Sequence, residues 1–551
     1  MKTRDDVALD VLVEHTRAVL TMRRAYREER FGLVLGAGVS RGFTFHVPDW
    51  KALLSLIASH AKVGGIGVDK PESGMITRAD VLYQHFTARR LAALRAEYQV
   101  TDESARSEQD KVERMARAEW REIIREILYK SSPVPERLHT QHPYLGEFLE
   151  IVLNSPLTVT YNFDSYLESM LSATPGSRGL NPRGRGFETV FEGLAPVRSR
   201  KGVIYHPNGY LPQNVLEKAS ERLVFSAEEF GDQLMDSIAG RYSSLSYHLS
   251  KNISLFLGLS LVDENLRYFL RRNAVNHPGH HHYYVEYQRS ENDIPQDRRT
   301  ALFGHRFTTY NLITLFLTDS QIAALGYLIK LRTPEFLELT RRAAVPNKYI
   351  YYLTGVPGIG KTTALRQLAS VGVYDEWMSD PNPLLARPHN ELEEHERETL
   401  DSWVADEFRR KNHELVVEEE GVMVVERAPL DPISFERSDR IADKARRFAK
   451  RVIPGRGERL AAGDVVLLWG DPEIVSSRIA GRQTTPQRPD YIGELQASLR
   501  DRIYGREELH PLRSTEWRIN ELAKRVAEVI HLKESRPMDL HDQLSRLQEG
   551  A

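Results

Sequence analysis

"LTVTYNFDSYLE" (157–168) is an apolar, β-branched run that leads directly into Asn162 and Asp164, with a helical pattern following from Ser165. β-Branched residues favour strands, and the last residues of a strand lie at the edge of its sheet. The stretch therefore predicts a buried strand that ends in an amide and a carboxylate. Asn162 and Asp164 could equally form an Asx turn that caps the helix, which is an interpretation without a ligand.

Similar apolar runs recur along the chain and alternate with helical stretches. They lie at 31–35, 202–206, 253–261, 281–287 and 311–317, and a second series lies at 349–355, 422–432 and 464–472. Buried strands that alternate with helices predict parallel sheets covered on both faces. We therefore expect an α/β fold with two domains.

The expected domain boundaries follow from these two series and from the charged stretches around them. We predict an N-terminal helix (1–29), a first domain (30–335) with a charged helical insertion (about 76–130), a linker (336–348), a second domain (349–535) and a polar tail (536–551).

Composition excludes several classes of protein. The chain has 551 residues, a net charge of -2 and no cysteine, so it has no disulfide, thiolate nucleophile or cysteine-ligated zinc. It shows no clear basic footprint for nucleic acid or an anionic membrane. No stretch approaches the roughly 18 apolar residues of a membrane span, and the start lacks a signal-peptide core. We expect a soluble, cytoplasmic protein.

The second series opens with "GVPGIGKTT" (355–363), which fits the pattern G-x-x-x-x-G-K-[ST] between a strand and a helix. In such a P-loop, backbone N–H groups surround phosphates, the lysine reaches the β- and γ-phosphates, and the hydroxyl holds Mg²⁺. Lys361 and Thr362 would have these two roles. The candidate ATP-binding residues here are Gly355, Gly358, Gly360, Lys361, Thr362 and Thr363.

Downstream of this loop, the strand at 422–426 ends in Glu426 and Arg427, and a later "GDPEIVSSRIAGRQ" carries Arg478 and Arg482 at a helical i, i+4 spacing. Residues 349–535 resemble the thymidylate and deoxynucleoside kinase family of P-loop proteins. The resemblance implies a carboxylate near the metal and acceptor at Glu426, and contacts with phosphates or acceptor from the three arginines. Residues 371–412 depart from that family, since they show no acceptor-base pocket, so nucleotide binding is better supported than phosphoryl transfer.

The first series carries five short motifs in a fixed order. They are "GAGVS" (36–40), "VPDW" (47–50), "TVTYNFD" (158–164), "VIYHPNG" (203–209) and "GLSLVDE" (258–264). Together they resemble the sirtuin family across about residues 30–330. The resemblance implies a Rossmann-like domain that binds NAD.

The sirtuin resemblance implies roles for individual residues. Asn162 would lie beside the nicotinamide–ribose bond, and Asp164 would help to hold the ribose. The residues implied to contact NAD in two further loops are Gly36, Ala37, Gly38, Ser40, Gly258, Ser260 and Asp263. An amide and a carboxylate suit this cleavage, because the ribose becomes oxocarbenium-like while neutral nicotinamide leaves.

Two departures from the sirtuin pattern matter. The chain cannot form the four-cysteine zinc module of the deacylases, which leaves glycosidic cleavage, the activity of zinc-free sirtuin-like domains in anti-phage proteins. The position of the catalytic histidine holds Asn208, and His206 lies two residues earlier, about 6.6 Å away in an extended chain. His206 could serve as the general base. Alternatively, it is structural and Asn208 stands in for the base.

The combined expectation is an NAD hydrolase, forming ADP-ribose and nicotinamide, that is regulated by a domain binding ATP or another nucleoside triphosphate with Mg²⁺. The resemblance implies a setting of anti-phage abortive infection, with a phage-derived trigger or partner protein, and we expect a homo-oligomer. Three alternatives remain open. They are a nucleotide kinase with a sirtuin-like NAD or ADP-ribose sensor, a non-catalytic, nucleotide-dependent assembly protein, and a protein ADP-ribosyltransferase.

Overall fold

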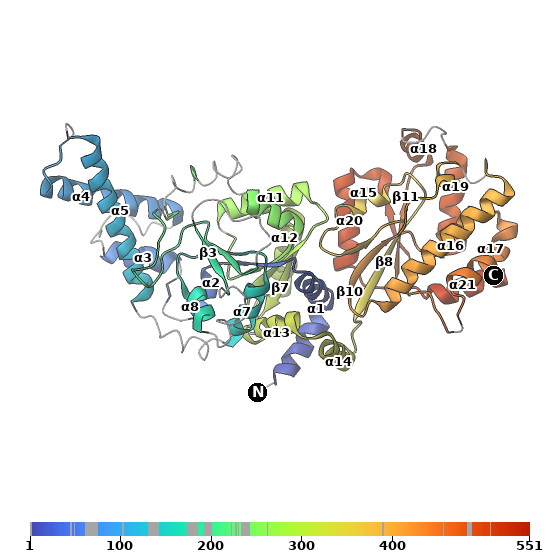
Figure 1. Cartoon of the computed structure of the whole chain (residues 1–551), viewed down its shortest axis with the longest axis horizontal. Helices are drawn as coiled ribbons and strands as arrows, with labels where there is room; N and C mark the ends of the chain where they lie inside the picture. Colours follow the sequence, from blue (N-terminus) through green and yellow to red (C-terminus); the bar gives the residue numbers. More distant parts are fainter. Residues whose placement is uncertain are drawn as a thin grey trace. The chain divides into compact units, whose positions relative to one another are not determined.

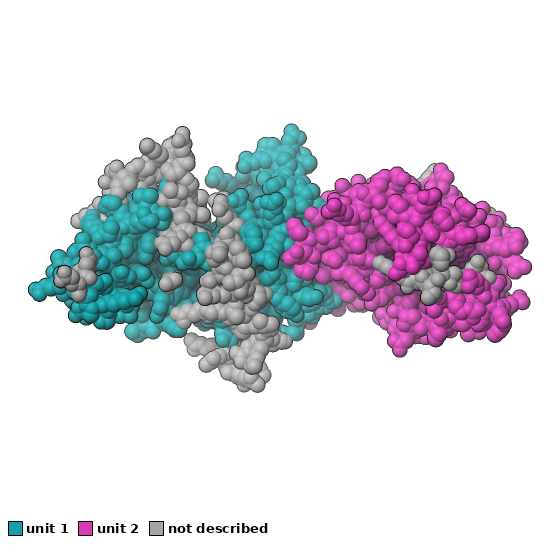
Figure 2. Space-filling model, turned by 90° about the horizontal axis from the view of Figure 1, so that it is seen from above, with its two compact units in different colours: residues 1–8, 25–273, 282–330 teal, residues 9–24, 274–281, 331–551 magenta. Residues whose placement is uncertain are grey.

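The structure is a computed structural model whose residues fall into two compact units. Unit 1 comprises 1–8, 25–273 and 282–330, and unit 2 comprises 9–24, 274–281 and 331–551 (Figures 1 and 2). The residues that the structure describes are 3–43, 47–48, 50–60, 75–101, 104–130, 143–173, 186–191, 201–221, 223–225, 229, 231–232, 243–261, 263–291, 293–387, 391–455, 457–481, 487–506 and 509–550.

The described strands of unit 1 form a seven-stranded parallel sheet in the order β3-β4-β2-β1-β5-β6-β7. The strands are β1 (Phe31–Leu35), β2 (Thr158–Thr160), β3 (Glu188–Val190), β4 (Val203–Tyr205), β5 (Ile253–Leu257), β6 (His282–Tyr287) and β7 (Leu312–Leu317). In such a sheet the carboxyl ends of all strands meet at one edge, and ligands bind where the strand order reverses. The chain builds outward from β1 in both directions, so this point lies at the end of β1.

Helices cover both faces of this sheet. Figure 1 shows α11 and α12 on one face and α7 and α13 on the other. The helices of this part of the chain are α2 (Ala37–Phe43), α3 (Trp50–His60), α4 (Met75–Glu97), α5 (Arg106–Tyr129), α7 (Pro143–Asn154), α8 (Tyr166–Ala173), α10 (Ser243–Lys251), α11 (Glu264–Asn276), α12 (Gln296–Tyr310) and α13 (Asp319–Lys330). The core between sheet and helices includes Val34, Val159, Phe256, Leu270 and Tyr284, all nearly inaccessible to solvent.

The insertion expected near 76–130 is helical, as α4 and α5, and packs with α3 around an aromatic cluster. In this cluster Trp120 and Phe225 lie 5.5 Å apart between ring centres, and Trp50 and Phe163 lie 6.2 Å apart. Phe163 stands between Asn162 and Asp164 in the sequence. The insertion therefore supports the strand end that carries these two polar side chains.

Unit 2 holds a five-stranded parallel sheet in the order β12-β11-β8-β10-β9. Its strands are β8 (Lys348–Thr354), β9 (Gly372–Tyr374), β10 (Gly421–Glu426), β11 (Asp464–Trp469) and β12 (Leu509–Arg513). Its helices are α14 (Thr333–Ala343), α15 (Lys361–Leu365), α16 (Glu394–Val417), α17 (Ile441–Val452), α18 (Pro472–Ala480), α19 (Pro489–Ala497), α20 (Ile519–Leu532) and α21 (Leu540–Glu549). The expectation of an α/β fold with parallel sheets is confirmed for both units.

Part of the N-terminal helix α1 (Arg4–Arg27) belongs to unit 2. Arg23 pairs with Glu420 through Nε and Oε2 at 2.9 Å, and both side chains are only 1% exposed. The Arg23 guanidinium also lies 3.7 Å from the ring centre of Phe336. Unit 2 thus contains an ion pair that is fully removed from water and joins segments nearly 400 residues apart.

The stretches expected to be a linker and a polar tail contain helices. The expected linker, 336–348, contains most of α14, and the expected tail, 536–551, contains α21. In α21 the apolar residues Leu540, Leu544 and Leu547 recur at helical spacing and are buried, which explains why the stretch folds. Among the described residues, none of the helices is both long and apolar enough to cross a membrane.

Candidate functional site

The glycine loop after β1 touches the loop after β5 backbone to backbone. Gly36 N–H donates to Leu257 O at 3.0 Å, and Gly38 N–H donates to Gly258 O at 2.9 Å. A Cβ at position 38 would lie 2.8 Å from Gly258 Cα, and Gly258 has a φ of +65°. Only glycine allows this approach, so the two motifs form one continuous floor at the carboxyl edge of the sheet.

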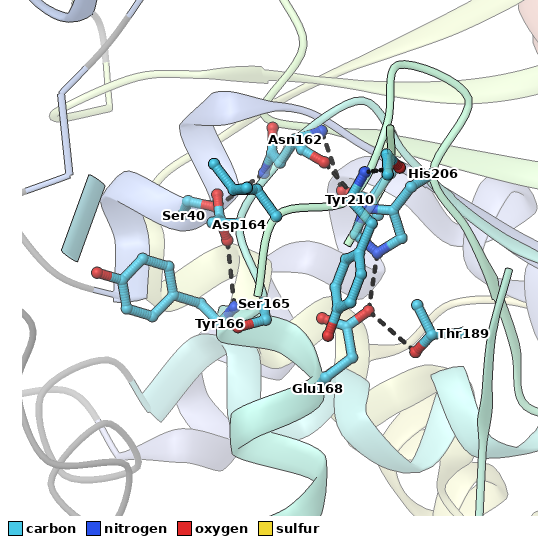
Figure 3. Close-up of polar contacts among 12 residues, drawn as sticks. Ser40, Asn162, Asp164, Ser165, Tyr166, Glu168, Thr189, His206 and Tyr210 are labelled. Carbon is cyan, nitrogen blue, oxygen red and sulfur yellow. Dashed lines mark hydrogen bonds and ion pairs between the residues drawn. The ribbon is translucent and has the colours of Figure 1, made fainter. Parts of the chain in front are cut away.

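Asn162 at the end of β2 is bound to that floor. Its Nδ2 donates to Gly36 O at 3.0 Å and to Ser40 Oγ at 2.7 Å (Figure 3). Both amide hydrogens are therefore used within the protein. No hydrogen bond to its Oδ1 comes from the described residues, so this oxygen is the part of the side chain that can meet a ligand.

Asp164 is buried and accepts hydrogen bonds from two partners. Its Oδ2 accepts from Ser40 Oγ at 2.7 Å, and its Oδ1 accepts from Tyr166 N–H at 3.2 Å, which is the Asx turn at the start of α8. Burial raises the pKa of Asp164 to about 6 although both hydrogen bonds lower it. The structure thus contains the helix cap that was the alternative interpretation, and it also places this carboxylate 2.7 Å from the Ser40 hydroxyl that Asn162 contacts.

His206 follows β4 and is completely buried. Its Nδ1 lies 2.9 Å from Asn162 O, and its Nε2 lies 2.8 Å from Glu168 Oε1 on α8 (Figure 3). The ring of Tyr210 packs edge-on at 4.7 Å between centres. Both ring nitrogens are engaged by the protein, so neither presents a free lone pair to a substrate in this arrangement.

The other residues implied by the sirtuin resemblance have varied surroundings. Asn208 is buried, and its Nδ2 donates to Tyr161 O at 3.4 Å while its backbone O accepts from Val224. Asp263 Oδ1 accepts from Leu266 N–H at 2.8 Å and so caps α11. Ser260 is exposed. Asn208 therefore holds a turn together, and the amide and carboxylate near Ser40 form the centre of the site.

In unit 2, three glycines of the loop after β8 have backbone conformations that other residues rarely adopt. Gly355, Gly358 and Gly360 have φ angles of +142°, +76° and +111°, and α15 begins at Lys361. Lys361 Nζ donates to Gly355 O at 2.9 Å and to Val356 O at 3.1 Å. Burial, assisted by nearby Arg427, lowers the pKa of Lys361 to about 8.

Further charged groups gather beside this loop. Thr362 Oγ1 donates to Glu426 Oε1 at 2.5 Å, and Arg427 forms an ion pair with Glu376. Lys411 Nζ donates to the backbone oxygens of Glu376 and Glu426 at 2.8 Å and 3.1 Å. A hydroxyl and a carboxylate in contact are the oxygen donors that Mg²⁺ prefers, so the residues fit the metal expected here.

Sequence reasoning missed Glu376 and Lys411, which lie in the stretch that departs from the kinase family. Three cations and three anions meet in this cluster, namely Lys361, Lys411, Arg427, Glu376, Glu426 and Asp431. Burial would raise the pKa of Glu376, but Arg427 and Lys361 lower it overall. No stretch of the sequence indicates this balance, because it depends on side chains from separate strands and helices.

The remaining nucleotide candidates are less constrained. Arg478 is exposed on α18, which ends at Ala480, two residues before Arg482. Arg482 itself lies outside the described residues, so the shared helical face expected for this pair rests on the sequence alone. Thr363 is half-buried in α15. Across the described ranges, no group of three or more His, Asp and Glu side chains is arranged to hold a metal ion.

A comparison with protein families finds one match. Residues 156–312 match the family model described as "SIR2-like domain". The match covers β2 to the start of β7 and includes Asn162, Asp164 and His206, whereas the glycine loop at 36–40 lies before it. No curated protein matches the chain. The match supports the sirtuin-like, NAD-related character of unit 1.

Proposed function

We propose that unit 1 hydrolyses NAD to ADP-ribose and nicotinamide at the site around Asn162 and Asp164. The observation that carries this proposal is the amide Oδ1 of Asn162, left open beside the buried Asp164 carboxylate within the stretch that resembles sirtuins. The glycine loop supplies the close backbone approach that the NAD phosphates require.

The chemistry needs charge stabilisation more than a strong nucleophile. The bond between C1′ and the pyridinium nitrogen breaks, and its electron pair leaves with neutral nicotinamide. A water oxygen then bonds to C1′, and one water proton is released. The Asn162 dipole and ionised Asp164 stabilise the positive charge that develops on the ribose. Because the pKa of Asp164 is about 6, this carboxylate is mostly ionised at neutral pH.

Unit 2 would bind ATP or another nucleoside triphosphate through Lys361, with Mg²⁺ held at Thr362 and Glu426, and would regulate the hydrolase. Magnesium would neutralise phosphate charge when bound. An unregulated NAD hydrolase would harm its host, which gives a reason for the fusion. By analogy with the family, we place the protein in anti-phage abortive infection, as a homo-oligomer that responds to a phage-derived trigger or partner protein.

A second candidate function is a nucleotide kinase with a sirtuin-like sensor of NAD or ADP-ribose. The observation that favours it is the contact between Thr362 and Glu426, since a kinase needs both a metal-binding hydroxyl and a nearby carboxylate. The open amide oxygen of Asn162 and the buried Asp164 carboxylate favour the hydrolase, because together they can stabilise positive charge that develops on the ribose, which binding alone does not require.

Product analysis separates these functions. The purified chain would be incubated with adenine-labelled NAD and a mixture of nucleosides, with and without Mg²⁺-ATP, and nicotinamide, ADP-ribose and phosphorylated nucleosides would be quantified by chromatography. We expect equal amounts of both products and no NAD-derived label on protein. Phosphorylated nucleoside without nicotinamide would favour the kinase, and label on protein would indicate ADP-ribosyl transfer. No turnover under any condition would contradict both enzymatic functions.

A further inference from the structure

Glu168 is a buried carboxylate that none of the recognised motifs assigns to the site. It lies on α8 one helical turn after Asp164 and is 6% exposed. Its Oε1 contacts His206 Nε2 at 2.8 Å and Thr189 Oγ1 at 3.5 Å. Its Oε2 is buried and accepts no hydrogen bond from the described residues. Burying an oxygen without a hydrogen-bond partner costs free energy in the folded state, so a carboxylate retained there calls for a functional explanation.

The hydrogens around His206 can be counted. Asn162 O is a carbonyl and can only accept, so His206 Nδ1, at 2.9 Å from it, carries a hydrogen. The 2.8 Å contact between Nε2 and Glu168 Oε1 also needs one hydrogen between the two atoms. That hydrogen resides either on the ring, beside a carboxylate, or on a carboxyl group, beside a neutral ring. Glu168 and His206 therefore share one proton.

We propose that Glu168 is a positioning residue that shares a proton with His206 and thereby holds the Asn162 amide in place for NAD cleavage. The inference rests on the proposed hydrolase and deepens it. Glu168 fixes the imidazole, the imidazole Nδ1–H fixes the backbone carbonyl of Asn162, and the Asn162 side chain then keeps Oδ1 directed to the ligand. His206 acts through Asn162, so it needs no free lone pair.

Other titratable groups face the pair from the neighbouring elements. Asp164 lies in the loop before α8, Tyr210 lies in the loop after β4, and Tyr129 lies at the end of α5. Burial raises the pKa of both tyrosines, so both stay protonated over the working range. Asp164, with its pKa raised by burial to about 6, sets an acidic limb of the activity profile.

Two variants separate loss of the contact from loss of the charge. In Glu168→Gln, the amide N–H donates to Nε2 of a neutral ring whose hydrogen stays on Nδ1, so the contact is kept. Glu168→Leu keeps the approximate volume but removes the contact altogether.

The test is kcat and KM of nicotinamide release at pH 7.5 by the full chain for these two variants. Ser172→Ala, an exposed position on the same helix, is the matched control. We expect Glu168→Leu to lose about 10- to 100-fold in kcat with KM for NAD little changed, as carboxylates that orient histidines do in metal sites. Glu168→Gln should keep most of the wild-type kcat, because it preserves the contact with His206. Thermal unfolding of each variant shows whether the chain is folded.

Two outcomes overturn the inference while leaving the hydrolase intact: a folded Glu168→Leu variant as active as wild type, or a folded Glu168→Gln variant that loses as much kcat as Glu168→Leu. If the wild type releases no nicotinamide at any pH, the proposed function fails instead. ¹⁵N-histidine NMR then tests the pair without turnover, with His206 assigned from a His206→Gln variant. We expect a hydrogen on Nδ1 in both wild type and Glu168→Gln. A bare Nδ1 in the wild type would contradict the inference, because His206 would then not donate to Asn162 O.

Discussion

The two units bury charge in opposite ways. Unit 1 buries the carboxylates Asp164 and Glu168 with a histidine and hydroxyls, and no Lys or Arg takes part in that network of described residues. The cluster beside the glycine loop of unit 2 instead holds three cations with three anions, and the same unit buries the ion pair Arg23–Glu420. The first arrangement suits a ligand that becomes positively charged, and the second suits a polyphosphate with its metal. The contrast separates the two sites by chemistry without reference to family.

The largest expected effect comes from breaking a buried pair of unit 2. Arg23→Ala leaves Glu420 buried without its cation, and we expect a loss of about 3–5 kcal/mol in the free energy of unfolding. Chemical denaturation of the full chain measures it, with the exposed Arg27→Ala on the same helix as control. A double change of Arg23 to Met and Glu420 to Leu should recover most of the loss. An unchanged stability for Arg23→Ala would show that unit 2 does not depend on charge balance.

The next effect concerns ligand charge in unit 2. Lys361→Ala removes one cation from the glycine loop, and we expect the affinity for Mg²⁺-ATP to fall about 100-fold. Titration calorimetry provides the measurement, and exposed Lys450→Ala on α17 is the control. Equal affinity in both variants would remove the nucleotide site from this loop. We also expect Lys361→Ala to alter how ATP changes nicotinamide release, while Asn162 remains necessary for it.

Asp164→Asn tests the buried carboxylate of unit 1, which has no Lys or Arg in its network of described residues. The pKa of Asp164 is about 6 in the folded chain and about 3.9 when unfolded, so the folded state binds more protons between these values. Its contribution therefore destabilises the fold above pH 6, by up to about 3 kcal/mol, and this destabilisation disappears as the pH falls towards 4. We expect the variant to be more stable than wild type at pH 7.5 and no more stable at pH 4, while nicotinamide release is lost.

Calorimetric scans at the two pH values provide the measurement for Asp164→Asn. A variant less stable than wild type at pH 7.5 would mean that the Asx cap and the Ser40 hydrogen bond outweigh the burial of charge. In that case the carboxylate would be structural and the contrast between the units would fail.

The smallest expected effect comes from removing one anion beside the glycine loop of unit 2. Glu376→Gln releases Arg427 from its ion pair, and we expect the affinity for Mg²⁺-ATP to rise about fivefold, or about 1 kcal/mol. Exposed Glu398→Gln on α16 is the control. Weaker binding would instead assign Glu376 to the ligand or its metal.

Much of this arrangement could be predicted from the sequence, because parallel sheets bring strand ends together. Buried strands followed by Gly36, Asn162 and His206 place these residues at one edge once the sheet is parallel. The strands β3, β9 and β12 were not predicted. β3 and β9 are three-residue strands, and β12, "LHPLR", contains a proline and only two aliphatic side chains, so none has a clear hydrophobic pattern.

The missed site residues had weaker signals. Glu168 lies four residues after Asp164, which caps the predicted helix, so one helical turn separates the two carboxylates. This spacing was the indication that Glu168 lies near the site. The pairing of Arg23 with Glu420 had none, since the partners are 397 residues apart and each lies in an ordinary charged stretch. Such contacts depend on how whole helices and strands pack against each other, which a local sequence pattern does not predict.

The most direct test of the central claim is the rate of nicotinamide release from NAD by the wild type and by Asn162→Ala at pH 7.5, with exposed Asn276→Ala as control. We expect that Asn162→Ala, while folded, loses at least about 100-fold in rate, because a group that stabilises transition-state charge is removed. The control should match the wild type. A folded Asn162→Ala variant as active as the wild type would contradict the assignment of this site.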